Sequence, residues 1–214
     1  LLPLTRLAVV GWSGPQGLGA YLAVVTNAQY FRSLVSTVVL SLGVTAATLV
    51  VSGVAGLFLT RNEFPGKKVL LAMLTFPLAF PGVVVGFMVI MLAGRQGLIG
   101  DVSEWVLDER IVFAYSMAGL FTGYLYFSIP RVILTVMAAA EKLDPALEEA
   151  ARSLGASPWR VVRDVIIPGL MPALVSAGAI CFATSMGAFG TAFTLATKIN
   201  VLPITIYTEF TNYA

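Results

Sequence analysis

One polar, helix-forming stretch, residues 141–168, interrupts an otherwise very apolar sequence, and its residue types suit docking to another protein rather than catalysis. Asp144 precedes Pro145, a pair typical of a helix start because the carboxylate can accept backbone N–H bonds and proline suits the first helical position. Gly155 stands where a left-handed residue can end that helix, and the Ser-Pro pair at 157–158 repeats the start signal. The stretch therefore predicts two short helices separated by a bend at Gly155.

The first of these helices carries an apolar stripe of small residues. The stripe repeats at three- and four-residue spacing, and it consists of Leu147, Ala150, Ala151 and Leu154. Three charged residues can flank it, namely Glu148, Glu149 and Arg152. Because alanine side chains are small, they let another surface approach closely, so this face is predicted to be a docking surface.

The motif in this stretch resembles the EAA loop of type I ATP-binding-cassette importer permeases, the binding-protein-dependent transport family. In that loop Glu-Ala-Ala is followed by three residues and a glycine, and later by two aliphatic residues close to a proline. The residues that match the pattern are Glu149, Ala150, Ala151, Gly155 and Pro168. Val165 and Ile167 stand where isoleucine and leucine are usual, and both keep an apolar branched side chain.

The resemblance implies an all-α, polytopic membrane protein with a cytoplasmic coupling-helix hairpin. It implies that this subunit works with a second permease subunit or copy, with separate ATPase subunits and with an external or periplasmic solute-binding protein. It also implies that the hairpin couples the membrane helices to the ATPase through Glu149, Ala150, Ala151, Arg152, Gly155 and Pro168. ATP and Mg²⁺ would be held by the ATPase, so this chain is expected to contain no cofactor and not to be an enzyme.

The composition also indicates a protein that lies in a lipid bilayer. Of the 214 residues, 58% are hydrophobic and only 11% are charged, far from the quarter-charged average of soluble domains. The absence of histidine and the single cysteine, Cys181, exclude a Ser-His-Asp triad, an imidazole metal site and an internal disulfide. The basic residues are spread among loops, so no nucleic-acid partner is expected, and without a phosphate-binding loop any ATP must be bound by another chain.

Four complete membrane spans are predicted, at about residues 34–60, 69–93, 111–129 and 169–189. Residues 1–32 are expected to be the end of a truncated first span followed by an external loop. Residues 33–214 are expected to form the permease domain, with a partial span at its end.

Prolines predict where these helices bend or stop. Pro77 and Pro81 should kink the second span, because each removes a backbone hydrogen bond. The Pro-Arg pair at 130–131 should mark the end of the third span. The second short helix of the EAA loop is expected to stop by Pro168.

Loop charges predict the orientation in the plasma (inner) membrane. The connection at 61–68 and the insert at 130–168 lie on the same side, because two spans separate them. Together they hold eight of the thirteen basic residues: Arg61, Lys67, Lys68, Arg131, Lys142, Arg152, Arg160 and Arg163. By the positive-inside rule that side is the cytoplasm, so the EAA loop is expected to face the compartment that contains ATP.

Polar and aromatic side chains within the spans are candidates for the translocation path. They are Tyr124, Tyr126, Ser128, Thr184 and Ser185. The competing interpretation is that hydroxyl groups bond their own helix backbone and that tyrosines anchor at the membrane interface. No carboxylate or arginine is expected near the middle of a complete span, so the sequence predicts no tight site for a charged solute.

Three segments resemble the family branch that handles polyamines, sulfate or molybdate, ferric iron, thiamine and phosphonates, namely residues 76–81, 186–190 and 202–207. Within that branch a small polar solute such as a polyamine is expected. A secondary transporter and a membrane enzyme are the alternatives. The first would need ionisable residues at mid-membrane and the second a catalytic constellation, and the sequence shows neither.

Overall fold

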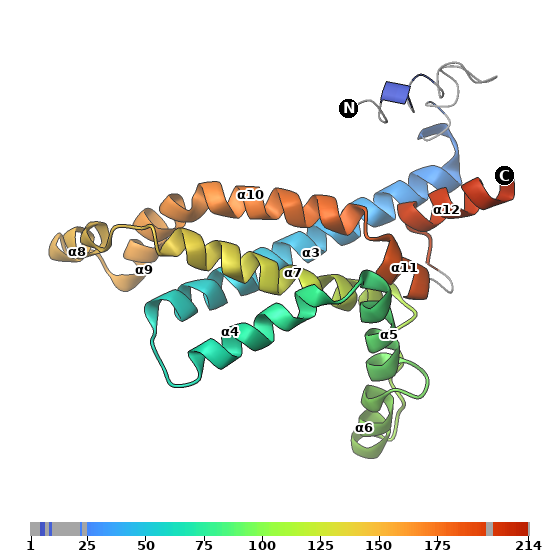
Figure 1. Ribbon diagram of the computed structural model, residues 1–214, viewed down its shortest axis with the longest axis horizontal. Coiled ribbons are helices and arrows are strands. Elements are labelled where there is room, and N and C mark those ends of the chain that lie inside the picture. The colour runs from blue at the N-terminus through green and yellow to red at the C-terminus, as the bar shows by residue number, and fades with distance from the viewer. Residues whose placement is uncertain (1–4, 7–8, 10–21, 23–24, 196–198, 214) are drawn as a thin grey trace.

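The computed structural model describes residues 5, 6, 9, 22, 25–195 and 199–213, and in this part of the chain all regular secondary structure is helical (Figure 1). From residue 28 onward the elements are α3 (Ala28–Arg61), α4 (Lys67–Thr75), the 3-10 turn η1 (Phe76–Ala79), α5 (Gly82–Ala93), α6 (Leu98–Leu107), α7 (Met117–Ala140), α8 (Pro145–Ser153), α9 (Pro158–Val161), the π turn η2 (Val162–Ile166), α10 (Ile167–Met186), α11 (Phe189–Leu195) and α12 (Leu202–Tyr213). The all-α class predicted from the sequence is confirmed. The expected end of a first span, within residues 1–10, falls almost entirely outside the described residues.

Four apolar helical stretches are long enough to cross a membrane: Ala28–Arg61, Gly82–Leu107, Met117–Ala140 and Pro158–Met186. They confirm a polytopic protein whose described part has four potential spans. The first begins several residues earlier than the predicted residue 34. The reason is a helix cap, because the Asn27 side chain accepts a hydrogen bond from Gln29 N at 2.9 Å.

The second predicted span, residues 69–93, is not one helix. After α4, η1 contains Pro77, and the backbone is then extended at Phe80 and Pro81, with ψ of 134° and 148°, before α5 begins. Two prolines so close together remove backbone donors and disfavour helical geometry in the residues before them. The predicted loop at 94–110 contains a further helix, α6, and Figure 1 shows α5 and α6 turning away from the direction of α3, α7 and α10.

The third span extends further than predicted, because α7 continues to Ala140. Pro130 lies inside this helix and is buried, so the prediction that the span ends at Pro130 and Arg131 is wrong. The proline ring removes one backbone hydrogen bond of α7. Beside it, Ser52 Oγ of α3 donates to the carbonyl of the preceding residue, Ile129, at 3.1 Å. Arg131 therefore lies in the membrane-spanning helix.

The predicted stop at Pro168 is also wrong, because α9, η2 and α10 form one continuous run from Pro158 to Met186. Within the π turn η2, Ile167 N donates to Val162 O. A wider turn directly before a proline accommodates the missing N–H, so the helix continues instead of ending.

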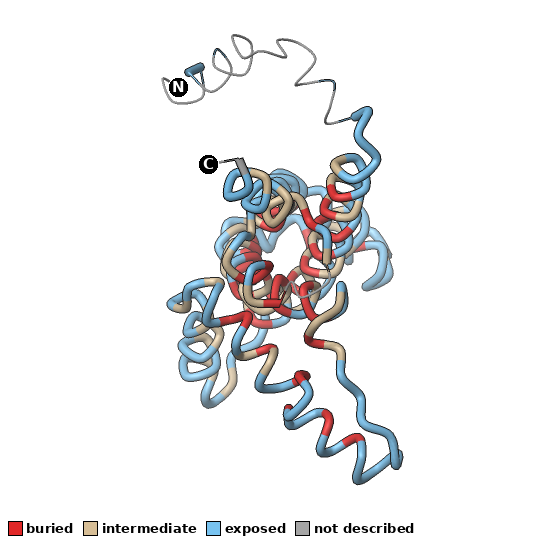
Figure 2. Tube along the Cα trace, turned by 90° about the vertical axis from the view of Figure 1, so that its right-hand side faces the viewer, coloured by how far each residue is buried: buried red, intermediate tan, exposed pale blue. Residues whose placement is uncertain are grey.

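Helices α3, α7 and α10 supply much of the core, and the end-on view shows buried residues on the sides of the helices that face one another (Figure 2). Gly56 permits a close approach of α3 to α7, since a Cβ at this position would lie 2.8 Å from Val136 Cγ1. Between Val35 and Phe58 the exposed side chains of α3, such as Val50 at 68% exposure, are apolar. Such an outer surface suits contact with lipid.

Candidate coupling and translocation sites

Helix α8 is capped at both ends as the sequence predicts. The Asp144 carboxylate accepts a hydrogen bond from Ala146 N at 2.9 Å. At the other end Gly155 has a φ of 82°, in the left-handed region, and Ala156 N donates to Ala151 O at 3.0 Å. This six-residue closure is a Schellman cap, which favours glycine because a Cβ would strain the left-handed backbone.

One face of α8 is fixed to the membrane helices. The carboxylate of Glu148, a buried residue, forms an ion pair with the guanidinium of Arg61, the last residue of α3. Ala151 is half-buried and packs against the main hydrophobic core. These contacts connect α8 to α3 and to the core.

The opposite face of α8 is open. Leu147 and Leu154 are 56% and 89% exposed, and the predicted coupling residues Glu149, Ala150 and Arg152 are also exposed. The predicted apolar stripe is thus divided between two faces, because Ala151 points to the core while Leu147, Ala150 and Leu154 point outward. Pro168 is exposed but belongs to α10, so the structure does not bring it onto the outward face of α8.

The ion pair of Arg61 with Glu148 was missed by the sequence analysis, which placed Glu148 only at the flank of the apolar stripe. The two residues are 87 positions apart in the chain. No periodicity or motif joins residues at such a separation, so only the fold reveals the contact.

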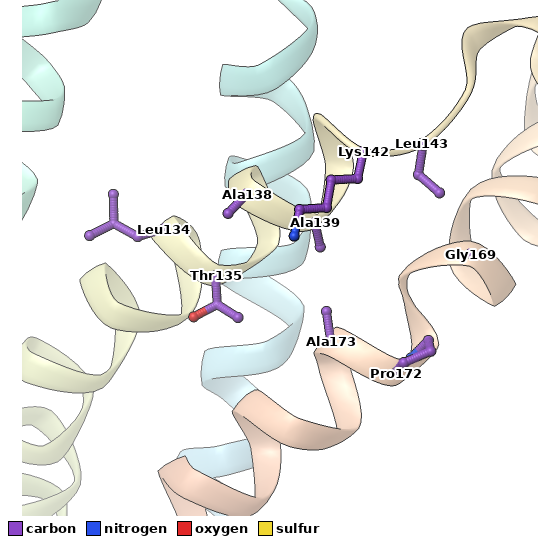
Figure 3. Close-up of a pocket in the computed structure, with 9 residues that line it drawn as sticks. All are labelled: Leu134, Thr135, Ala138, Ala139, Lys142, Leu143, Gly169, Pro172 and Ala173. Atoms are coloured by element: carbon purple, nitrogen blue, oxygen red, sulfur yellow. The ribbon is translucent and has the colours of Figure 1, made fainter.

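A cavity of about 660 Å³ lies beside the connection from α7 to α8. Figure 3 shows its lining residues on the last turns of α7, on the following loop and on the first turns of α10. The lining consists of Leu134, Thr135, Ala138, Ala139, Lys142, Leu143, Gly169, Pro172 and Ala173. Lys142 is its single charged residue, so the cavity holds no acid–base pair.

The structure gives the predicted path residues different roles. Tyr124 is buried, and its hydroxyl donates to Ala188 O at 3.0 Å, which links α7 to the connection between α10 and α11. The hydroxyls of Ser128 and Ser185 are buried and have no hydrogen-bond partner within the described part of the chain. Tyr126 is half-buried.

Thr184 is the one predicted path residue that lines a second cavity, of about 280 Å³, at the break between η1 and α5. We call this cavity the break pocket. It is lined by Pro77, Leu78, Phe80, Gly82, Phe127, Arg131, Thr184, Ala188, Gly190 and Thr191. Arg131 is its single charged residue, a member that the sequence analysis missed because it placed Arg131 outside the span.

Glycines pack α5 against α11 beside this pocket. Thr191 Oγ1 donates to Gly82 O at 2.9 Å, and a Cβ at Gly86 would lie 2.7 Å from Thr194 Cβ. These contacts fix the start of α5. Among the described residues, no three His, Cys, Asp or Glu side chains come together as potential metal ligands.

Residues 48–211 match the family described as "Binding-protein-dependent transport system inner membrane component". The chain is 35% identical over 180 residues to the molybdenum transport system permease protein of Escherichia coli strain K12, covering 80% of this chain and 77% of that protein. It is also 35% identical over 211 residues to the sulfate transport system permease protein of the same strain, covering 93% of this chain and 70% of that protein.

The fold matches that of a solved transporter chain. The structure is that of a bacterial alginate ABC transporter in complex with an alginate pentasaccharide-bound periplasmic protein, and the match has a TM-score of 0.76 at 16% identity. It covers 99% of this chain and 79% of that chain. With the relatives named as permease proteins and four helices able to cross a membrane, the chain is a multi-pass membrane protein that belongs to the family of binding-protein-dependent transport system inner membrane components.

Proposed function

We propose that this chain is the permease subunit of an ATP-driven importer and that α8 couples it to separate ATPase subunits. The observation that supports this most is the division of α8 into two faces. Glu148 and Ala151 hold the inner face against the bundle, while Leu147, Ala150 and Leu154 leave the outer face free. A short helix with caps at both ends can transmit a rigid-body movement from a docked motor protein. ATP and Mg²⁺ are then held by that partner.

We further propose that α8 lies on the cytoplasmic side of the inner membrane. The α3–α4 connection and α8 lie at the same end of the molecule (Figure 1), where Arg61 meets Glu148. With Arg131 inside a span, seven of the eight basic residues assigned to this side remain, and the positive-inside rule still favours the cytoplasm. Beyond the C-terminal end of α5, Asp101 and Glu104 of α6 form ion pairs with Arg110. The positive charge of Arg110 is therefore neutralised there.

The proposed partners are two ATPase subunits, a second permease subunit or copy, and an external solute-binding protein. One chain with four described spans leaves polar pathway residues such as Thr184 at a partly open surface. A second permease would enclose the path. The binding protein would deliver the solute when the ATPases close around ATP.

For the solute we propose a small oxyanion in place of the polyamine expected from the sequence. The relatives described above are named for molybdenum and for sulfate. Sulfate is a tetrahedral oxyanion, and dissolved molybdenum(VI) is present as the tetrahedral oxyanion molybdate. The two names therefore share one ligand chemistry, and a polyamine has the opposite charge.

Co-purification tests the coupling proposal. The tagged chain should retain a co-expressed ATPase subunit, and the complex should hydrolyse ATP faster when a solute-loaded binding protein is added. Ala150→Arg places a bulky charge on the outer face of α8 and should remove both properties, whereas Asn62→Arg adds the same charge at the same end, off α8, and should preserve them. Equal behaviour of the two variants would contradict the role given to α8.

A further inference from the structure

We infer that Arg131 makes the break pocket an anion-binding point on the translocation path, which a small oxyanion contacts as it crosses the membrane. This inference rests on the proposed importer function and adds to it the residue that selects the charge of the solute. The chemical class that the pocket recognises is a tetrahedral oxyanion such as sulfate or molybdate.

The position of Arg131 calls for a functional explanation. In α7, which spans Met117–Ala140, Arg131 lies about 4 Å from the midpoint of the helix axis at a rise of about 1.5 Å per residue. A charged side chain at such a depth is costly unless it faces a cavity, water or a partner. Arg131 does face a cavity, since it lines the break pocket.

No carboxylate in the described part of the chain neutralises this charge. The ion pairs found there engage Arg61, Lys67, Arg110 and Arg163. The elements that supply the pocket lining, η1, α5, α7, α10 and α11, contain no aspartate or glutamate. Among the residues that the structure describes, the pocket therefore carries one uncompensated positive charge.

Among the side chains that line the pocket, the guanidinium of Arg131 has hydrogen-bond donors left unused, whereas the hydroxyls of Thr184 and Thr191 do not. Thr184 Oγ1 donates to Ile180 O at 2.8 Å, and Thr191 Oγ1 donates to Gly82 O at 2.9 Å. The donors of Arg131 make no side-chain hydrogen bond to another described residue. Its planar fork of N–H groups matches two oxygens of an oxyanion.

The size and walls of the pocket suit a small anion in transit. A volume of about 280 Å³ far exceeds the roughly 10–15 Å³ that a single water molecule requires, so the pocket has room for a tetrahedral oxyanion. Phe80 and Phe127 supply apolar walls, and these strengthen the interaction with the charge by lowering the local dielectric. A single arginine binds weakly enough for the anion to leave again, as conduction requires.

The site can be tested without transport. In a Cys181→Ala background, Thr184→Cys places a thiol on the pocket lining, and its modification rate is measured with an anionic and a cationic methanethiosulfonate reagent. With Arg131 present, the ratio of anionic to cationic modification rates should be higher than in Arg131→Gln, and sulfate should slow the reaction of the anionic reagent. Arg131→Gln should lower the ratio of anionic to cationic rates about tenfold, a change of about 1.4 kcal/mol, while Arg131→Lys should retain most of it.

Uptake supplies the second readout. In proteoliposomes with the ATPase and binding protein, Arg131→Gln should reduce uptake of labelled sulfate or molybdate about tenfold, whereas Arg95→Gln in the exposed α5–α6 loop should not. ATP hydrolysis stimulated by the loaded binding protein should stay within about twofold of the wild type in both variants. An unchanged reagent ratio in Arg131→Gln, or no effect of sulfate on the reaction, would overturn the anion site even if the importer function holds. If Arg131→Gln lowers the ratio of reagent rates but the chain does not co-purify with an ATPase subunit, the importer function is refuted and the anion site is not.

Discussion

Replacing Glu148 by glutamine removes the negative charge that holds α8 against the end of α3. Two unit charges about 4 Å apart attract by about 4 kcal/mol at an effective dielectric constant of about 20, and desolvation offsets part of this. The side chains of Arg61 and Glu148 are 35% and 11% exposed, which places the pair between a surface and a buried ion pair. We therefore expect a coupling energy of about 1–3 kcal/mol between the two charges.

A double-mutant cycle with Glu148→Gln and Arg61→Gln measures this energy from the free energies of unfolding in mixed micelles. The control is the ion pair of Glu63 with Lys67, because Glu63 is 86% exposed and neither residue belongs to α8. The coupling energy of this control pair should be below about 0.5 kcal/mol. In the assembled importer, Glu148→Gln should also lower solute-stimulated ATP hydrolysis, and Glu63→Gln should not. Equal coupling energies for the two pairs, or full stimulation in Glu148→Gln, would refute the role of this contact.

Two further variants probe the glycines. Gly155→Pro should abolish transport-coupled ATP hydrolysis while the protein still inserts into the membrane, because φ at Gly155 is 82° and proline fixes φ at about −65°. The control is Gly66→Pro in the α3–α4 connection, where φ is 92°. This variant should leave the coupling intact. Gly86→Ala should destabilise the detergent-solubilised protein by about 1–3 kcal/mol in thermal unfolding, because its Cβ would lie 2.7 Å from Thr194 Cβ. Gly53→Ala, with nothing within 4 Å of its Cβ, should be neutral or slightly stabilising. Coupled hydrolysis in Gly155→Pro, or similar losses of stability in both alanine variants, would contradict these assignments.

Local chemistry explains the features that the sequence predicted correctly. The caps at Asp144 and Gly155 depend on residues within one helical turn, so a single short segment contains the whole signal. The number of potential spans follows from the length and hydropathy of segments of about twenty residues, although the second lies at Gly82–Leu107 and not at 69–93. Neither feature requires knowledge of distant neighbours.

The errors share one origin, because proline was interpreted as a helix terminator. Helix α7 instead continues through the buried Pro130, and before Pro168 a π turn accommodates the missing donor. Because α7 was predicted to stop at Pro130, Arg131 was placed in a loop and the prediction of no arginine in mid-span followed from that error.

The division of α8 into two faces could not be predicted either. Ala150 and Ala151 are adjacent and equally small, and a helix that contacts the bundle on one side and a partner on the other has apolar residues on both. The ion pair of Glu148 with Arg61 decides which side is the inner one. That pair joins residues that lie far apart in the chain.

Site-specific photo-crosslinking of the assembled importer tests the account most directly. A photoreactive amino acid at Leu154, which is 89% exposed at the C-cap of α8, is compared with the same group at Trp105, which is 87% exposed on α6. The two helices lie well apart in Figure 1. We predict a crosslink to the ATPase from position 154 and none from position 105. A crosslink to the ATPase from position 105, or none from position 154 in a complex that hydrolyses ATP, would contradict coupling through α8.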